Sequence, residues 1–137
     1  VFDRHNQSIG ALAIDPSDPK TVWVGTGEPW VRNSVSVGDG VYRTTDGGES
    51  WTRMGLDSTE RIAAVRVSPR DPRVVYVCAL GHLWNDHPDR GVYRTGDGGK
   101  TWARVLHVNA GTGCASLDVD PSDPQVVYAA MWQFRRT

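Results

Sequence analysis

Tryptophan flanked by polar side chains occurs in three segments of this 137-residue chain, and these segments hold most of its candidate chemistry. Indole rings stack on sugars and on peptide side chains, while neighbouring carboxylates, amides and cations supply hydrogen bonds. We therefore predict a glycan- or peptide-recognition site, unless the indoles only fill space between packed sheets or in a central channel, as large aromatics often do. The predicted site residues are Glu28, Trp30, Arg32, Trp84, Asn85, Asp86 and His87.

Catalysis has weaker support in the sequence. Hydrolysis of a glycosidic bond needs two carboxyl groups roughly 5–10 Å apart. Glu28 is the best local candidate, and Asp86 or Asp89 could face it, but no spacing in the sequence establishes such a pair. We therefore expect a non-catalytic segment. The alternative is a glycoside hydrolase that uses Glu28 and is completed by residues outside this chain.

No pattern of metal ligands stands out in the sequence. His82 and His87 lie near Asp86 and Asp89, but their spacing matches no zinc motif. Neither a complete calcium loop nor a phosphate-binding glycine loop is present. We expect no metal and no cofactor.

A sequence repeat supplies the elements that must position these segments. The octet at 44–51, Thr-Thr-Asp-Gly-Gly-Glu-Ser-Trp, recurs at 95–102 as Thr-Gly-Asp-Gly-Gly-Lys-Thr-Trp, and Gly-Val-Tyr-Arg precedes both copies. Glycine permits positive φ angles, and an Asp carboxylate can accept hydrogen bonds from the N–H groups of its own turn. Each octet therefore predicts a tight hairpin turn, with the Trp anchoring it against a sheet.

Apolar alternation predicts strands in three copies of a longer unit of about 52 residues. Each copy has two strands joined by a Pro-x-Asp-Pro link, whose prolines, such as Pro16 and Pro19, should stop both strands. The alternation places on one face Leu12 with Ile14, Val65 with Val67, and Leu117 with Val119. Two further strands flank each octet, and no segment is typical of a helix. The sequence predicts an all-β chain of antiparallel four-stranded meanders, at about 9–56 and 62–108, with half of a third at 114–132.

The octets resemble the Asp-box, the bacterial neuraminidase repeat, whose pattern is Ser/Thr-x-Asp-x-Gly-x-Thr/Ser-Trp. The matching residues are Thr44, Asp46, Gly48, Ser50 and Trp51, and then Thr95, Asp97, Gly99, Thr101 and Trp102. The resemblance implies a β-propeller of about two and a half blades, with one box in each full blade between its third and fourth strands. It gives the box a structural role on the rim, away from the binding face.

Residues 6–10, 23–28 and 129–136 also look like sortilin-like or glycosyl-hydrolase-like repeat propellers of bacterial exported proteins. That resemblance implies a secreted or periplasmic protein. Sialidases that carry the box also need an arginine cluster and a Tyr/Glu pair, and the sequence offers no assignable pair of that kind. In a meander the links between second and third strands emerge opposite the boxes, so the tryptophan segments should share one face.

The predicted partners follow from the blade count. Propellers close with roughly four to eight blades, so two and a half should expose apolar end faces. We expect the remaining blades of a parent propeller, or self-association, to cover these faces, and we interpret the chain as a fragment. The net charge of −1 gives no argument for nucleic acid, and no apolar run or leader predicts a membrane segment or signal peptide.

Two cysteines occupy repeat positions that favour burial. Cys78 corresponds to Gly25 and Ala130, and Cys114 corresponds to Ile9 and Ile62. We expect buried, inert thiols, with a disulfide as the alternative in an oxidising compartment.

Overall fold

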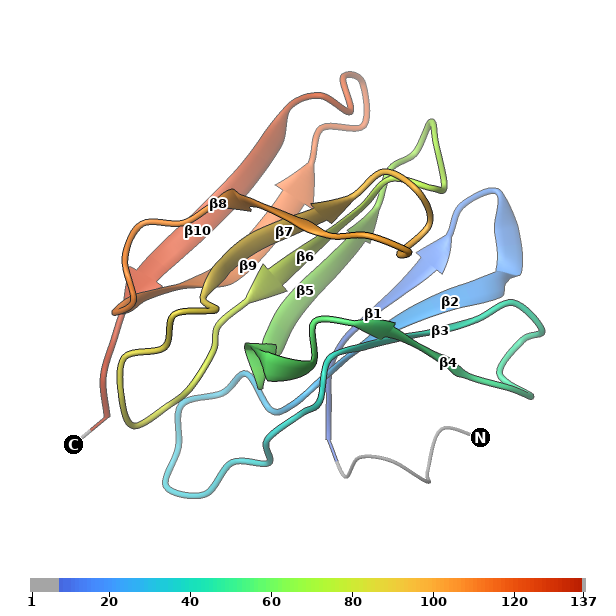
Figure 1. Cartoon of the computed structure of the whole chain (residues 1–137). Coiled ribbons are helices and arrows are strands. Elements are labelled where there is room, and N and C mark those ends of the chain that lie inside the picture. The colour runs from blue at the N-terminus through green and yellow to red at the C-terminus, as the bar shows by residue number, and fades with distance from the viewer. Residues whose placement is uncertain (1–7, 137) are drawn as a thin grey trace.

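The computed structural model describes residues 8–136, which form ten strands and one short 3₁₀ turn, η1 (Asp57–Thr59) (Figure 1). Residues 6 and 7, part of the segment compared above with exported propellers, lie outside this range. None of the described residues forms a helix long and apolar enough to cross a membrane. The strands are β1 (Ile9–Asp15), β2 (Asp18–Thr26), β3 (Val41–Thr44), β4 (Thr52–Gly55), β5 (Ile62–Val67), β6 (Val75–Ala79), β7 (Gly91–Thr95), β8 (Ala103–Leu106), β9 (Thr112–Val119) and β10 (Val127–Gln133).

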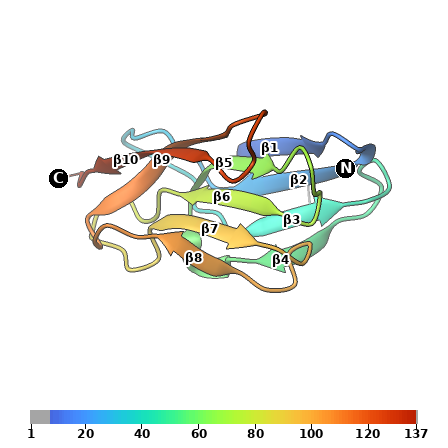
Figure 2. The same cartoon turned by 90° about the horizontal axis from the view of Figure 1, so that it is seen from above.

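The strands form three antiparallel sheets in simple meander order. The sheet orders are β1-β2-β3-β4, β5-β6-β7-β8 and β10-β9, which we name blade one, blade two and the half blade. The first strand of blade two, β5, contacts both β1 and β9, and Figure 2 shows these first strands along one side with β4 and β8 on the other. The predicted all-β fold of partial propeller blades is confirmed.

The link between β1 and β2 is shorter than the sequence predicts. Asp15 pairs with Asp18, so Pro19 lies inside β2, and the expectation that both prolines stay outside the strands is wrong here. The first β2 residue paired with β3 is Val22, so Pro19 removes no hydrogen bond from that ladder. In blade two, β6 begins only at Val75, after the second proline of its link.

The octets fold as turns held by their own carboxylates. Asp46 Oδ1 accepts a hydrogen bond from Ser50 N at 3.0 Å, and Asp97 Oδ1 accepts from Thr101 N at 3.0 Å. These bonds hold the pKa of both carboxyl groups well below its usual range, with the side-chain hydroxyls of Ser50 and Thr101 as the largest cause. Both glycines of each turn have positive φ angles, as glycine alone readily allows.

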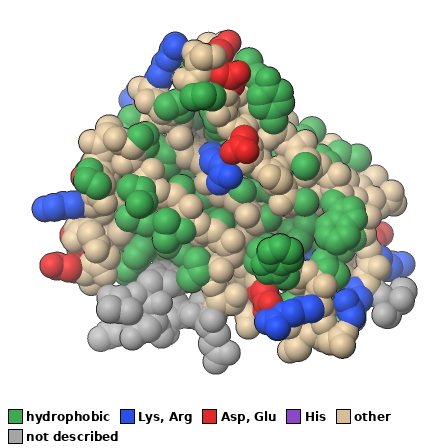
Figure 3. Space-filling model, turned by 180° about the vertical axis from the view of Figure 1, so that it is seen from behind, with side chains coloured by type: hydrophobic (Ala, Val, Ile, Leu, Met, Phe, Trp, Pro, Cys, Tyr) green, Lys and Arg blue, Asp and Glu red, His purple; other side chains and the backbone are tan. Residues whose placement is uncertain are grey.

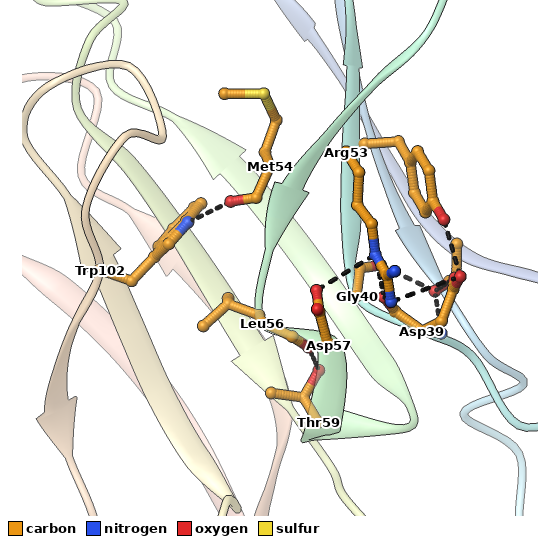
Figure 4. Close-up of polar contacts among 10 residues, drawn as sticks. Asp39, Gly40, Arg53, Met54, Leu56, Asp57, Thr59 and Trp102 are labelled. Carbon is orange, nitrogen blue, oxygen red and sulfur yellow. Dashed lines mark hydrogen bonds and ion pairs between the residues drawn. The ribbon is translucent and has the colours of Figure 1, made fainter.

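The second octet also fastens blade two to blade one. The indole of Trp102 donates a hydrogen bond to Met54 O at 2.7 Å, across the gap between β8 and β4 (Figure 4). Its ring packs edge-on against Trp23, with centroids 6.3 Å apart. In return, Arg43 of β3 donates to Gly98 O at 2.8 Å. These contacts lie at the octet end of the blades, which we call the rim.

The predicted apolar faces are buried only where a neighbouring blade covers them. Val65 and Leu117 are buried, whereas Leu12 is 58% exposed and Ile14 is 55% exposed. No described blade packs on that side of blade one, and this accounts for the difference. The core between blades one and two consists of Trp23, Val41, Ile62, Val65, Val75 and Val77.

The two cysteines form a disulfide, so the expectation of free thiols is wrong. Cys78 and Cys114 are both fully buried, with Cα atoms 5.1 Å apart. Their repeat positions, one late in a second strand and one early in the next blade's first strand, face each other across an interface. Gly25 and Ile62 show the same relation between blades one and two, where a Cβ on Gly25 would lie 2.4 Å from Ile62 Cγ2.

Candidate functional site

The three tryptophan-bearing segments meet at the end of the molecule opposite the rim (Figure 1). We call this end the loop face. It comprises the β2–β3 connection, the β6–β7 connection and residues 134–136. Leu80, Leu83 and Phe134 form a small buried core there, with Val31 and Val35 packed against it. The meander topology had predicted that these connections would lie together.

A hollow of about 450 Å³ opens between the loop face and the first strands of the blades. Gly10, Ala63 and Ala115 occupy equivalent positions in β1, β5 and β9, and all three are small residues that line it. The hollow's lining residues are Gly10, Pro29, Trp30, Val31, Ala63, Leu80, Ala115 and Trp132. Figure 3 views this side of the molecule and shows apolar side chains spread across it.

Trp30 is the one residue of the predicted site that lines this hollow. Trp30 is 76% exposed, so it does not pack between the described sheets. Trp132, named in the third segment but not among the predicted site residues, lines the same hollow and is also exposed. Two accessible indole rings therefore border one apolar recess.

Glu28 and Arg32 belong to the same turn as Trp30. Arg32 Nε donates a hydrogen bond to Glu28 Oε1, and this bond is the largest cause of a lowered pKa for the Glu28 carboxyl. An ionised Glu28 is suited to accept hydrogen bonds rather than to donate a proton. Asp86, one of the carboxylates considered as its partner, instead lies 3.9 Å from Arg135.

The rest of the predicted site lies in the β6–β7 connection, outside the lining of the hollow. Trp84 is 41% exposed, and the Arg136 guanidinium lies 5.9 Å from its ring centroid. His87 is packed against the neighbouring link, where its backbone N–H donates to Ala110 O at 2.8 Å, and burial lowers the pKa of its ring. Asn85 contributes its carbonyl to Arg90 at 3.0 Å. Arg136 also bonds Asn33, which joins this connection to the one that carries Trp30.

Two arginines outside the list of predicted site residues are buried. Arg61 and Arg90 are fully buried, and no described carboxylate forms an ion pair with either. Burial, followed by repulsion from Arg90, lowers the pKa of Arg61 to about 10. Arg61 Nε donates to Gly81 O at 2.6 Å, while its two terminal nitrogens have no hydrogen-bond partner.

The repeat itself contained a signal for Arg90. It directly precedes the Gly-Val-Tyr-Arg of blade two, where blade one has Asp39. Asp39 bonds within its own blade: its Oδ2 accepts from Tyr42 Oη at 2.7 Å, and its carbonyl accepts from Arg53 Nη2 at 2.8 Å (Figure 4). Burial raises the pKa of Tyr42 to about 12. A reversal of charge at a repeated position marks a departure from the blade pattern.

Metal ligation has no geometric support in the part of the chain that the structure describes. No three His, Cys, Asp or Glu side chains gather there as ligands of one ion would. His82 instead pairs with Glu60, with Nδ1 and Oε2 2.7 Å apart.

No family model matches this chain. A xyloglucanase from Paenibacillus sp is 30% identical over 122 residues, covering 80% of this chain and 11% of the relative. A xyloglucanase from Hypocrea jecorina is 28% identical over 128 residues, covering 87% of this chain and 14% of the relative. The dispase autolysis-inducing protein of Streptomyces mobaraensis is 31% identical over 133 residues, covering 90% and 34%. The chain thus spans a small part of each of these relatives.

Solved structures with the same fold include an ancestral GH74 enzyme, with a TM-score of 0.69 and 22% identity over 90% of this chain and 16% of that one. The GH74 xyloglucanase from Xanthomonas campestris has a TM-score of 0.57 and 19% identity, over 90% of this chain and 20% of that one. YCF48 bound to D1 peptide has a TM-score of 0.51 and 20% identity, over 83% of this chain and 30% of that one. At these identities the likeness establishes the fold, a segment of β-propeller similar to those of glycoside hydrolases.

Proposed function

We propose that this chain is a segment of a glycoside-hydrolase-like β-propeller and that its loop face binds a glycan in the hollow between Trp30 and Trp132. The observation that carries the proposal is a pair of exposed indoles on one recess of about 450 Å³. Sugar rings present apolar C–H faces that stack on indole, and a recess of this size is typical of ligand sites. The small residues of the first strands let a sugar ring approach the backbone.

The ligand class follows from the lining, in which no charged side chain takes part. Such a lining suits a neutral polysaccharide. Two of the relatives are named xyloglucanases, so xyloglucan oligosaccharides are the first probes to use. Glu28, ionised beside Arg32, directly precedes the lining residues Pro29 and Trp30 in the chain, and we propose that it accepts hydrogen bonds from sugar hydroxyls. A peptide ligand, which the sequence also allowed, is the competing class.

Within this segment the proposed role is binding rather than catalysis. Glycoside hydrolysis needs a protonated carboxyl group as general acid together with a second carboxylate. Glu28 is held in its ionised form, and no described carboxylate pairs with it across the hollow. If the parent protein is a hydrolase, Glu28 would act as the ionised member of a pair completed by other blades. Loss of turnover in a Glu28→Gln variant of the parent would establish that alternative.

We further propose that additional blades, or a second copy of the chain, cover the two end faces. Leu12 and Ile14 are exposed on blade one, and Tyr128 is 63% exposed on the half blade. Apolar surface of this kind favours association. The disulfide between Cys78 and Cys114 fits an oxidising compartment and supports a secreted or periplasmic location.

Calorimetric titration with xyloglucan oligosaccharides tests the binding proposal. We expect saturable binding that weakens at least about tenfold in Trp30→Ala or Trp132→Ala, a loss of about 1.4 kcal/mol for each stacking contact. Trp84→Ala is the matched control, because Trp84 is an exposed loop-face indole outside the hollow. An absence of binding, or an equal loss in the Trp84 variant, would contradict the proposal.

A further inference from the structure

Arg90 connects the β6–β7 connection, the β8–β9 link and the segment after β10 through a single side chain. Its Nη1 donates to Gly111 O at 2.6 Å and to Phe134 O at 3.1 Å. Its Nη2 donates to His82 O at 2.6 Å and to Asn85 O at 3.0 Å. The acceptors come from the β6–β7 connection, the β8–β9 link and the segment after β10. The planar guanidinium holds all four carbonyls in one fixed geometry, which a lysine ammonium cannot reproduce.

The same guanidinium lies against the ring of Phe134, 4.1 Å from its centroid. Phe134 is buried, and its N–H donates to Gly111 O at 3.1 Å, so both its backbone and its ring are fixed by the Arg90 cluster. The ring also has the Arg61 guanidinium 5.5 Å from its centroid, and it packs against Trp132, with ring centroids 4.9 Å apart and planes inclined by 33°. A continuous series of contacts therefore runs from Arg90 through Phe134 to Trp132.

Trp132 is the end of this series that reaches the hollow. Trp132 is 46% exposed, so part of its surface is free of packing. The contact with Phe134 constrains the orientation of its ring. Because a stacking interaction depends on the angle of the ring, the residue that fixes this angle also affects the affinity for a stacked ligand.

We propose that Arg90 is a positioning residue for the hollow: it holds Phe134 in place and, through Phe134, sets the orientation of Trp132. This inference rests on the proposed glycan site for its consequence in binding, but the positioning itself is a property of the free protein. The proposal also explains why blade two has a buried cation at this repeat position. Arg90 contacts the half blade, whereas its equivalent in blade one, Asp39, bonds within its own blade.

The test in the free protein uses the indole N–H signals of ¹⁵N-labelled chain. The Trp132 signal is assigned by its absence in Trp132→Phe. We expect Arg90→Lys and Phe134→Leu each to shift the Trp132 signal. The matched control is Arg43→Lys, because Arg43 also donates to a carbonyl of the next blade and lies 5.3 Å from a ring centroid, that of Trp23, but does so at the rim. This control should shift Trp23 or Trp102 and leave Trp132 unchanged.

The consequence for binding is tested by a double-mutant cycle with xyloglucan oligosaccharide. Arg90→Lys should weaken affinity about tenfold when Trp132 is present and have little further effect in the Trp132→Ala background. Independent, additive losses would overturn the proposal, as would an unmoved Trp132 signal in both Arg90→Lys and Phe134→Leu. If Arg90→Lys does not fold, Phe134→Leu carries the same comparison. If Trp132→Ala itself leaves affinity unchanged, the glycan site is wrong, while the indole shifts still decide the positioning role.

Discussion

The two interfaces between blades use the same repeat positions in different ways. Between blades one and two, Gly25 faces Ile62, and a large side chain fills the space that a missing Cβ leaves. Between blade two and the half blade, the equivalent positions hold Cys78 and Cys114, joined covalently. The first interface also has rim contacts from Trp102 and Arg43, whereas the second is fastened at the loop face by Arg90.

This difference shows that a repeated backbone geometry does not fix how two blades are held together. The interface between blades one and two has a rim indole bond and an apolar core. The half blade has only two described strands, and its interface adds the disulfide and the Arg90 guanidinium to an apolar core of its own, an ion pair between Arg66 and Asp118, and a hydrogen bond from Arg70 to Ser122 O. The more specialised interface is also the one beside the hollow, because Trp132 belongs to the half blade.

The largest effect should come from removing the covalent link. Replacing both Cys78 and Cys114 by Ala opens a loop with a sequence separation of 36 residues, which we expect to lower the free energy of unfolding by about 3–4 kcal/mol. Urea denaturation measures this loss. The matched variant is Cys78→Gly with Cys114→Ile, which copies the other interface and should recover part of it. An undiminished stability in the double Ala variant would contradict the comparison.

The complementary change crowds the first interface. Gly25→Ala places a methyl group 2.4 Å from Ile62 Cγ2, which should cost about 1–3 kcal/mol in unfolding free energy. Ala130 occupies the equivalent position in the half blade, where no described blade covers it, so Ala130→Gly should change stability much less. A Gly25→Ala variant as stable as the unsubstituted chain would show that Gly25 and Ile62 do not face each other as described.

A smaller effect is expected at the rim. Trp102→Phe keeps most of the aromatic packing against Trp23 but removes the donor to Met54 O. We expect a loss of about 0.5–1.5 kcal/mol, the usual contribution of one hydrogen bond. Chemical denaturation measures it, with oligosaccharide titration alongside. Trp102 is remote from the hollow, so ligand affinity should not change in this variant. A drop in affinity would contradict the independence of the rim and the loop face.

The smallest effect concerns acid stability. The folded-state pKa of Asp97 is lowered, chiefly by the Thr101 hydroxyl, so its contribution is complete above the unfolded value of about 3.9 and is lost as the pH falls below it. Asp97→Asn should therefore flatten the acid limb of the stability curve and leave its shape near neutral pH unchanged. Denaturation midpoints from pH 2 to 7 provide the measurement. A variant that retains the full acid limb would contradict this assignment.

The repeat made the fold predictable, because the period of the octets and the alternation of apolar residues are both written in the local sequence. The hydrogen bonds of Asp46 and Asp97 followed from turn chemistry for the same reason. The disulfide was only the alternative prediction, because Cys78 and Cys114 were each compared with their equivalents and not with the residue each would face across an interface. Gly25 and Ile62 occupy the same two repeat positions as Cys78 and Cys114, and they face each other between blades one and two. Comparing the two pairs would have indicated the disulfide.

The site was predicted only in part. Meander topology brought the three tryptophan segments to one end, but which indoles share a hollow depends on side-chain packing that no local pattern encodes. Trp30 and Trp132 lie on it, whereas Trp84 lies against Arg136. The role of Arg90 depends on four carbonyls from three separate segments of the chain, which no local pattern brings together.

The most direct test of the glycan site is a titration of ¹⁵N-labelled protein with a xyloglucan oligosaccharide, read through the indole N–H signals. The account predicts that Trp30 and Trp132 shift together along one saturation curve, because they line the same hollow, while Trp23 and Trp102 in the interface behind the rim stay in place. A titration with no saturable shift at Trp30 and Trp132, or with its largest shifts at Trp23 and Trp102, would contradict it.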